Sequence, residues 1–233
     1  MSIKISEKIY TDIQRDIIQG VYKIQSKLPP ERDLADRYGA NRFAIREAIA
    51  MLTNAGFVET RPQSGTYVKD FDSHCTLEML ARILLTNNTI DPKTLKSLLS
   101  FRAVNETLTT EKAASLVTEE DIEFLSQNLR EKEKNLHSPE RLAELDYEFH
   151  YRIVLISTDI MIRLIFTSMK QVYIIFTGLF YSLEGAPQQS LALNRKLLGS
   201  LAKKDPELSR NAMKKILSYG ERRLHEISSR HTR

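Results

Sequence analysis

Three arginines within a short segment could form a nucleic-acid surface. They are Arg32, Arg42 and Arg46, in the segment LPPERDLADRYGANRFAIRE (residues 28–47). A guanidinium group is planar and can donate two hydrogen bonds at once to a phosphate or to guanine O6 and N7. Taken singly, each arginine is more often a solvated or ion-paired surface residue. Their joint placement near the starts of two predicted helices, with a hairpin to follow, favours a surface that binds double-stranded DNA.

Two further polar pairs lie later in the chain. Arg102 and Glu106 are four residues apart, as are Asp146 and His150 in ELDYEFHYRIVL (144–155). Each pair therefore shares one face of a helix. An Asp and a His one turn apart can begin a metal site, but a complete site needs ligands from other helices, so a pair without metal is the alternative. No nucleophile, glycine-rich phosphate loop or paired-acid motif accompanies them, and we do not expect an enzyme.

Apolar spacing and helix-ending residues define the elements that position the first arginines. Pro30 suits the first turn of a helix because it lacks only an N–H that would be unpaired there. Gly39 stops this helix, and Asn41 offers an N-cap for the next one. The next helix repeats apolar residues on one face: Ile45, Ala48, Ile49 and Leu52. A helix, a tight turn and a second helix predict a helix-turn-helix.

The segment GFVETRPQSGTYV (56–68) predicts a β-hairpin directly after that unit. A hairpin in this position predicts a winged helix-turn-helix, in which the start of the second helix enters the major groove. We expect contacts to base edges or flanking phosphates from Asn41, Arg42, Phe43 and Arg46. Arg32 is expected to meet the DNA backbone. The wing is expected to contribute Gln63, Ser64, Gly65 and Thr66.

The rest of the chain is helical in pattern. Residues 70–76 are polar and unpatterned, which predicts a linker between a DNA-binding domain at 1–69 and a helical domain at 77–233. About seven amphipathic helices are expected: 76–86, 91–114, 118–136, 139–157, 159–183, 187–203 and 205–230. The predicted fold is therefore mainly α, a winged helix-turn-helix followed by an antiparallel all-α bundle. The segment at 162–180 is apolar nearly all round and is expected in the centre of the bundle.

Composition is consistent with a polyanion partner. The chain has 34 Lys and Arg against 30 Asp and Glu, a net charge of +4 and a pI near 9.0. Residues 195–233 hold 11 Lys and Arg against 4 Asp and Glu. A basic amphipathic helix is more often a solvated face than a second nucleic-acid site. No stretch approaches the ~18 uncharged apolar residues of a membrane span, so we expect a cytoplasmic protein without a membrane partner.

The first part of the chain resembles a known family. Residues 28–68, LPPERDLADRYGANRFAIREAIAMLTNAGFVETRPQSGTYV, are similar to the winged-helix domain of the GntR family of bacterial transcription regulators. The resemblance covers residues 6–69 and departs from the family pattern at Gln25-Ser26 and at Gln63. It implies DNA contacts by Arg32, Arg42, Arg46 and Gly65. It also implies variable base readout at Asn41, Phe43 and Ala44.

The second part resembles the ligand-binding domain of the FadR subfamily, through LLSFRAVNETLTTEKAA (98–114) and LAELDYEFHYRI (142–153). Many members carry an Asp and three His as a metal site beneath a carboxylate ligand. The resemblance places Asp146 and His150 at the first two positions, with Asn194 and Ile216 at the others. An aliphatic side chain cannot coordinate a cation, so we expect no tightly bound metal and no cofactor.

Other segments are similar to metal-free members of the subfamily that bind a long-chain acyl-CoA. These segments are AELDY (143–147), SLAL (190–193), the Met-Lys pair before Tyr173, and Tyr219-Gly220. The effector-site residues expected from spacing and resemblance are Arg102, Asp146, His150, Tyr173, Asn194, Tyr219 and Gly220.

These patterns predict a homodimeric transcription regulator that binds a palindromic operator. Its effector is expected to be an organic acid or an acyl-CoA, bound in the helical domain. The alternative is a metal- or carboxylate-sensing helical protein in which DNA binding is weakened. Both repression and activation remain open.

Overall fold

The computed structural model describes residues 4–70, 73, 79 and 92–228, and the chain divides into two compact units. Unit 1 spans Met1–Thr89 and unit 2 spans Ile90–Arg233. The described elements of unit 1 are α1 (Ile5–Ile18), α2 (Glu31–Tyr38), α3 (Arg42–Asn54), β1 (Val58–Arg61) and β2 (Gly65–Val68). Those of unit 2 are α6 (Pro92–Leu116), α7 (Glu119–Lys134), α8 (Pro139–Ile156), α9 (Ile160–Ser168), α10 (Lys170–Tyr181), α11 (Ala186–Ala202) and α12 (Pro206–Ser228).

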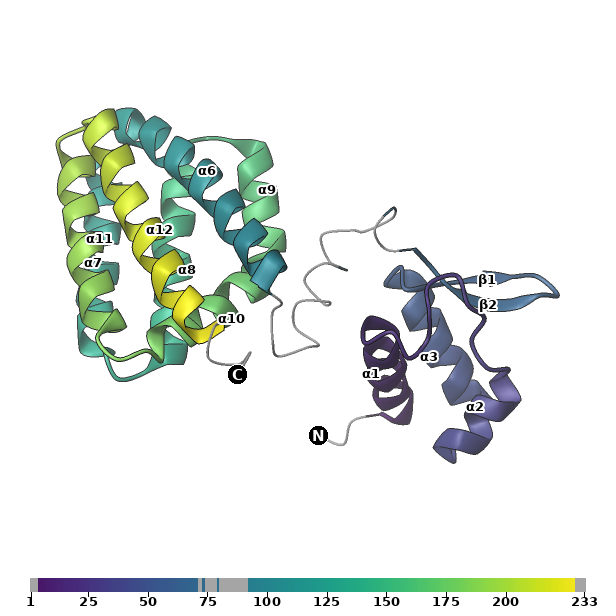
Figure 1. Ribbon diagram of the computed structural model, residues 1–233. Coiled ribbons are helices and arrows are strands. Elements are labelled where there is room, and N and C mark those ends of the chain that lie inside the picture. The colour runs from purple at the N-terminus through teal and green to yellow at the C-terminus, as the bar shows by residue number, and fades with distance from the viewer. Residues whose placement is uncertain (1–3, 71–72, 74–78, 80–91, 229–233) are drawn as a thin grey trace. The chain divides into compact units, whose positions relative to one another are not determined.

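The described part of unit 1 has three helices packed around a core, followed by a small hairpin (Figure 1). Gly39 ends α2 in a left-handed conformation, with φ 58, and Asn41 then caps α3. The apolar face of α3 packs against α1, and the core includes Leu34, Ile45 and Phe57, all fully buried. The predicted winged helix-turn-helix is therefore confirmed.

The wing is a two-stranded antiparallel hairpin. β1 and β2 pair with Arg61 opposite Gly65 at the turn. The stretch before α2 joins the hairpin edge, because the Leu28 N–H donates to the Thr66 carbonyl at 2.8 Å. Gln63 has φ 59, a left-handed conformation that glycine adopts more easily.

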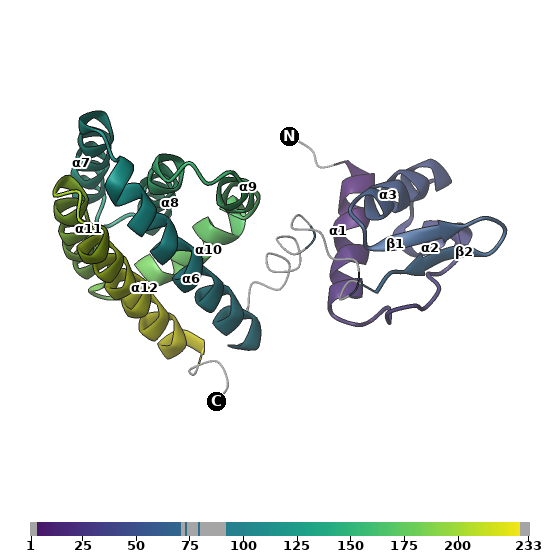
Figure 2. The ribbon, with the colours of Figure 1, turned by 90° about the horizontal axis from the view of Figure 1, so that it is seen from above.

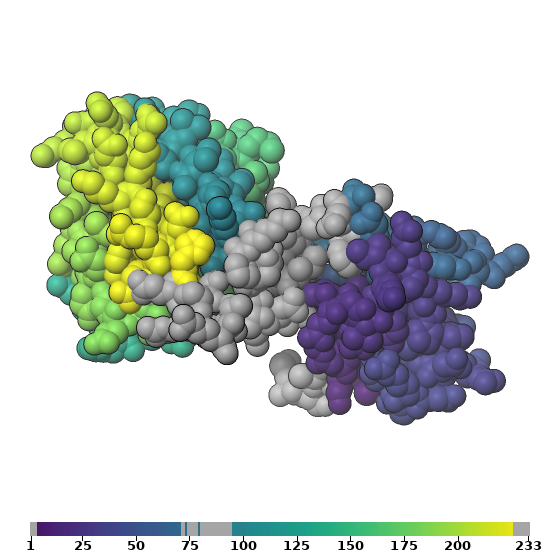
Figure 3. Space-filling view, in the orientation of Figure 1, coloured from purple at the N-terminus to yellow at the C-terminus, as the bar shows by residue number. Residues whose placement is uncertain are grey.

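Unit 2 is an all-helical bundle (Figure 2). α6 packs along α12, α8 packs against α10, and α11 packs against both α7 and α12. The space-filling view shows α12 lying against α6 and α11 (Figure 3). Fully or almost fully buried apolar residues of the core are Ala113, Leu125, Phe149, Ile153, Leu197 and Leu201. The predicted mainly α fold is confirmed.

The segment predicted as one central helix over 159–183 is two helices. α9 and α10 meet at Met169 and are bent by 66°. α9 has no buried residue, and Met161 and Leu164 on it are exposed, so its expected place in the bundle centre is wrong. The bend keeps α10 against α8 and turns one side of α9 toward a pocket. None of the described helices alone is long and apolar enough to span a membrane. The bent pair α9 and α10 together has the length and apolar composition of such a span, but only when the two helices are counted as one.

The division between the units comes later in the chain than the linker predicted at 70–76. Met79 is fully buried in the core of unit 1. Its sulfur lies beside Gly56, in ordinary van der Waals distance of the position that a Cβ would occupy there. This packing joins part of the predicted second domain to the first unit. The helix expected at 76–86 and most of the expected linker lie outside the described residues.

Candidate DNA-binding surface and effector pockets

The start of α3 presents a cation and an aromatic ring to solvent. The Asn41 side chain accepts a hydrogen bond from the Ala44 N–H at 2.9 Å, which begins the helix. Arg42 is exposed, and no ion pair involves it among the residues that the structure describes. Phe43 is 77% exposed. Because the first N–H groups of a helix and a free guanidinium both favour an anion, this end of α3 suits a phosphate.

The other two predicted arginines are exposed but ion-paired. Arg46 Nε lies 2.8 Å from Glu31 Oε2, and the Arg46 side chain is 68% exposed. Arg32 Nε lies 3.8 Å from Asp33 Oδ1, and the Arg32 side chain is 75% exposed. Exposed pairs contribute only about 0–1 kcal/mol to stability, so a DNA phosphate can replace the carboxylate.

Ala44 lies in the core and not on this surface. Its side chain is 4% exposed and packs in the apolar cluster of unit 1. The expectation that Ala44 takes part in base readout is therefore not met by the geometry. The physical reason is the helical period: Arg42 and Phe43 point outward, and the next position points inward.

The four predicted wing residues lie at the turn of the hairpin. Gln63 and Ser64 are exposed, and Gly65 and Thr66 are half-buried. Gly65 has φ +124, and a Cβ at this position would collide with the Lys27 side chain. The backbone conformation therefore favours glycine here, whereas the flexible Lys27 side chain could move aside to make room for a Cβ.

Two cations beside the wing were missed by the sequence reasoning. Arg61 is exposed, pairs with Glu59, and lies 4.5 Å from the centre of the Tyr67 ring. Lys27 lies against the glycine of the turn. Arg61 is the last residue of β1, next to the predicted turn, and that position was the available signal, whereas Lys27 is placed here only by its isolated bridge to Tyr67.

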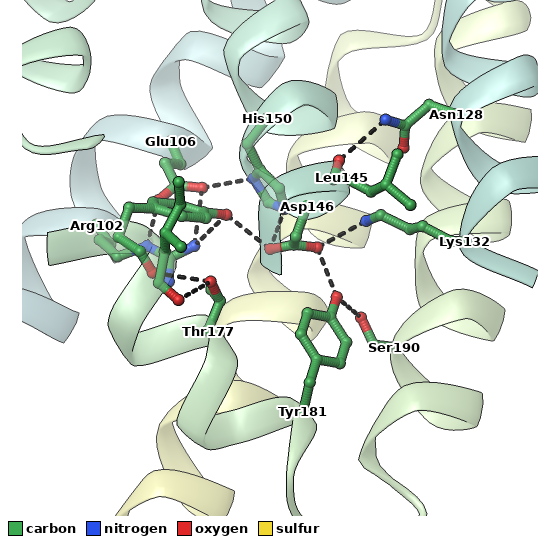
Figure 4. Close-up of polar contacts among 12 residues, drawn as sticks. Arg102, Glu106, Asn128, Lys132, Leu145, Asp146, His150, Thr177, Tyr181 and Ser190 are labelled. Atoms are coloured by element: carbon green, nitrogen blue, oxygen red, sulfur yellow. Dashed lines mark hydrogen bonds and ion pairs between the residues drawn. The ribbon is translucent and has the colours of Figure 1, made fainter. Parts of the chain in front are cut away.

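In unit 2, seven charged or titratable side chains form one buried network, part of which is labelled in Figure 4. Arg102 on α6 donates to both oxygens of Glu106, at 2.5 and 3.4 Å, and to the Tyr173 hydroxyl at 3.0 Å. His150 Nδ1 lies 2.6 Å from Glu106 Oε2, and His150 Nε2 lies 3.8 Å from Asp146 Oδ2. The two pairs predicted by four-residue spacing thus belong to a single cluster.

The cluster continues from Asp146 to α7 and α10. Asp146 Oδ1 accepts from Lys132 Nζ and from the Tyr181 hydroxyl, both at 2.7 Å. Asp146 Oδ2 accepts from the Tyr173 hydroxyl at 2.8 Å. Burial raises the pKa of Asp146, but the Lys132 ammonium and His150 outweigh it and hold that pKa well below its ordinary value. The Asp146 carboxylate is therefore ionised, and both of its oxygens accept hydrogen bonds.

Burial and charge partners also shift the pKa of the other members. Burial raises the pKa of Glu106, but Arg102 and His150 outweigh burial and lower it to about 2. Burial lowers the pKa of the Arg102 guanidinium, but Glu106 reverses that effect and the pKa is raised. Burial raises the pKa of Tyr173 and of Tyr181, so both hydroxyls remain hydrogen-bond donors.

Two pockets meet at Arg102. The first has an empty volume of about 620 Å³, including the part open to solvent, and lies between α6, α9 and α10. Its lining is almost entirely apolar and includes Phe101, Ile165, Phe166 and Phe176, with Arg102 and Glu106 among the few charged groups. The second pocket has about 530 Å³ by the same measure and is more polar. Arg102 and Leu99 line both pockets.

The structure brings most of the predicted effector residues together. Those that line one or both pockets are Arg102, Asp146, His150, Tyr173, Tyr219 and Gly220. Asn194 lines neither: it is fully buried on α11, and neither polar atom of its amide has a hydrogen-bond partner in the described part of the chain.

Two members of the network, Lys132 and Tyr181, were missed by the sequence reasoning. Lys132 follows Leu125 and Leu129 on the buried face of α7, and a lysine at such an apolar position was the available signal. Tyr181 gave no signal that distinguishes it from the neighbouring aromatic residues of α10.

The residues at the four positions of the subfamily metal site do not fit a metal. Both oxygens of Asp146 are taken by Lys132 and two tyrosines. Asn194 is an amide and Ile216 is aliphatic. Across the residues that the structure describes, no group of three or more His, Cys, Asp or Glu could hold a metal ion.

A winged helix-turn-helix with exposed cations on its recognition helix, joined to a helical unit with one apolar and one more polar pocket, defines a class of DNA-binding regulator with a ligand domain. Comparison with known proteins identifies the family. Residues 5–68 match the gntR family of bacterial regulatory proteins, and residues 97–219 match the FCD domain. The chain belongs to the GntR family, with an FCD domain as its second part, and is a DNA-binding transcriptional regulator and not an enzyme.

Relatives extend over nearly the whole chain. The HTH-type transcriptional regulator Mce2R of Mycobacterium tuberculosis is 28% identical over 213 residues, which are 91% of this chain and 88% of the relative. The Glc operon transcriptional activator of Escherichia coli is 27% identical over 235 residues, 96% of this chain and 90% of the relative. Among solved structures, Lar of Listeria monocytogenes has a TM-score of 0.67 at 18% identity, covering 97% of this chain and 99% of that chain. The last similarity concerns the fold alone.

Proposed function

We propose that two copies of this regulator bind a palindromic operator, and that an organic acid or acyl-CoA bound in unit 2 changes their affinity for it. Each winged unit would read one half-site, and a two-fold pair of units matches a two-fold DNA sequence. The effector would act by binding one arrangement of the units more tightly than another.

The DNA side of the proposal is supported by the exposed groups at the start of α3. Arg42 is exposed and forms no ion pair within the part of the chain that the structure describes, and Phe43 beside it is exposed, although large apolar rings are usually buried. Arg32 and Arg46 add cations that are held only by exposed carboxylates. We assign Arg42 and Phe43 to the groove, and the two paired arginines to flanking phosphates.

The effector side rests on one observation: Arg102 lies where an apolar pocket meets a polar one. Its Nε and Nη2 donate to Glu106 and Tyr173, and no hydrogen bond involves Nη1 in the described structure. A guanidinium with a donor to spare, beside an apolar wall, suits an acid with a hydrocarbon part. A carboxylate at Arg102 would place that hydrocarbon part between α6, α9 and α10.

The test begins with native mass spectrometry of the purified protein, to detect any ligand that co-purifies. DNA binding is then measured by fluorescence anisotropy on a duplex selected from random sequence. Probes are added in turn: citrate, a medium-chain fatty acid and a long-chain acyl-CoA. We expect at least one probe to change the Kd for DNA by about 5- to 150-fold, the range of ordinary allosteric coupling. Unchanged DNA affinity with every probe, and with any ligand recovered from the protein, would refute the effector proposal.

The two-fold arrangement has a separate test. Sedimentation of the protein with the selected duplex should give two chains on each duplex, and removal of one half-site should weaken binding. One chain on each duplex, with full affinity for a single half-site, would refute it.

A further inference from the structure

Lys132 is an unusual lysine because its ammonium group is buried. The side chain is 1% exposed, whereas lysine is almost never fully buried unless it is paired. It reaches from α7 to α8, where Nζ donates to Asp146 Oδ1 at 2.7 Å, and it lies 4.9 Å from the centre of the Phe149 ring. A buried ammonium in this position must have a reason that outweighs its loss of hydration.

The reason lies in the carboxylate that it meets. Asp146 is buried, and two tyrosine hydroxyls donate to it, but these donors carry no charge. His150 Nε2 lies 3.8 Å away, beyond hydrogen-bond distance. Lys132 therefore provides the one positive charge in direct hydrogen-bond contact with Asp146 in the described structure. A buried carboxylate that lacks such a charge is strongly destabilised.

We propose that the Lys132 ammonium is a built-in counter-cation, which occupies the place beside Asp146 that a divalent metal would need and makes unit 2 independent of metal. A metal would have to displace the ammonium from Oδ1 and would then find an amide at position 194 and an aliphatic side chain at position 216. The ammonium is tethered to α7, so it cannot be removed by a chelator. This inference concerns unit 2 by itself and does not depend on the proposed effector.

The arrangement also has a mechanical consequence. Lys132 connects α7 to α8 through Asp146, and Tyr173 and Tyr181 connect the same carboxylate to α10. Asp146 lines the polar pocket. The buried ammonium therefore positions one wall of that pocket, a task that a metal performs when it holds ligands from several helices.

The first experiment measures metal content and thermal stability of the intact protein. We expect less than about 0.1 equivalent of divalent metal after purification by a metal-free route. We also expect that 1 mM EDTA or 0.1 mM Zn²⁺ shifts the Tm by less than about 1 °C. A metal ion that does not bind the folded state does not change the stability of that state. A stoichiometric divalent ion whose removal lowers the Tm would overturn the proposal.

The second experiment is a double-mutant cycle with Lys132→Met and Asp146→Asn. Lys132→Met should lower the Tm by roughly 10 °C, since it leaves a buried charge unpaired. In the Asp146→Asn background the same change should cost less than half as much. Lys134→Ala on the same helix is the matched control, because Lys134 is 68% exposed and pairs only with Glu131 in the described structure. The Tm of the Lys134→Ala variant should stay within about 1 °C of the wild-type Tm.

Equal losses for Lys132→Met in the two backgrounds would mean that its charge does not serve Asp146, and the proposal would fail. If Lys132→Met does not fold, Lys132→Gln, which also removes the charge, replaces it in the cycle. The metal measurement on the unmodified protein decides the question independently of any variant.

Discussion

Arg42→Ala is the change that most directly tests the DNA-binding surface. Arg42 is exposed at the first position of α3 and has no ion pair in the described structure. Its removal should leave the fold intact, with a change in the free energy of unfolding of less than about 0.5 kcal/mol. Alanine also has a high helix propensity, so α3 should persist. Any loss of binding can therefore be assigned to the contact itself.

The expected loss follows from the contacts that one guanidinium can make. A bidentate contact to a guanine contributes about 1–3 kcal/mol to the free energy of binding. Loss of this contact should therefore weaken DNA binding about 5- to 150-fold for each winged unit. If the contact is to a phosphate, the slope of log K against log salt should become shallower by about 0.9 for each unit. On a two-fold operator both effects apply twice.

The assay is fluorescence anisotropy on the selected duplex at several KCl concentrations. The control is Arg15→Ala, which removes the same charge from α1, where Arg15 forms an exposed pair with Asp12. We expect the control to retain nearly wild-type affinity and slope. Equal affinities and equal salt slopes for Arg42→Ala and wild type would show that the start of α3 does not face DNA.

Three further outcomes are expected. Burial raises the pKa of Glu106, but Arg102 outweighs burial and lowers this pKa to about 2. The ionised Glu106 carboxylate therefore stabilises the folded state above pH 4.5, and this stabilisation is lost as the pH falls from 4.5 toward 2. Thermal melts followed by circular dichroism should show a smaller acid loss for Glu106→Gln, and identical acid profiles would contradict this reasoning. Gly65→Ala should lower DNA affinity severalfold in the same anisotropy assay, because alanine is strained at φ +124, while near-wild-type binding would show that the wing shape is unimportant. Tyr181→Phe should lower the free energy of unfolding by about 1.5–3 kcal/mol in urea titrations, since it removes a donor to the Asp146 carboxylate, and a loss below about 0.5 kcal/mol would argue against that bond.

Local patterns in the sequence were enough to predict the winged unit. Gly39 ends α2 through its left-handed backbone and Asn41 begins α3 through its side-chain cap, and both effects depend only on neighbouring residues. The apolar repeat of α3 and the turn before Gly65 are equally local. Ala44 differs from the expectation because the helical period turns its side chain inward, into the core.

In unit 2 the limits of the sequence are clearer. The 159–183 segment is apolar throughout, so periodicity could not show that it bends at Met169 or that α9 stays at the surface. Four-residue spacing paired Arg102 with Glu106, and Asp146 with His150, because those contacts lie within one helix. It could not show that the two pairs are joined, since that contact crosses from α6 to α8.

The sequence by itself determined which side chains share a helix face and where the recognition helix begins, because both follow from interactions between near neighbours in the chain. Only the tertiary structure decided that Lys132 is the partner of Asp146 and that Arg102 stands between an apolar and a polar pocket. These features depend on how α6, α7, α8 and α10 pack, and packing sets the burial that makes an isolated charge costly and a paired one stable.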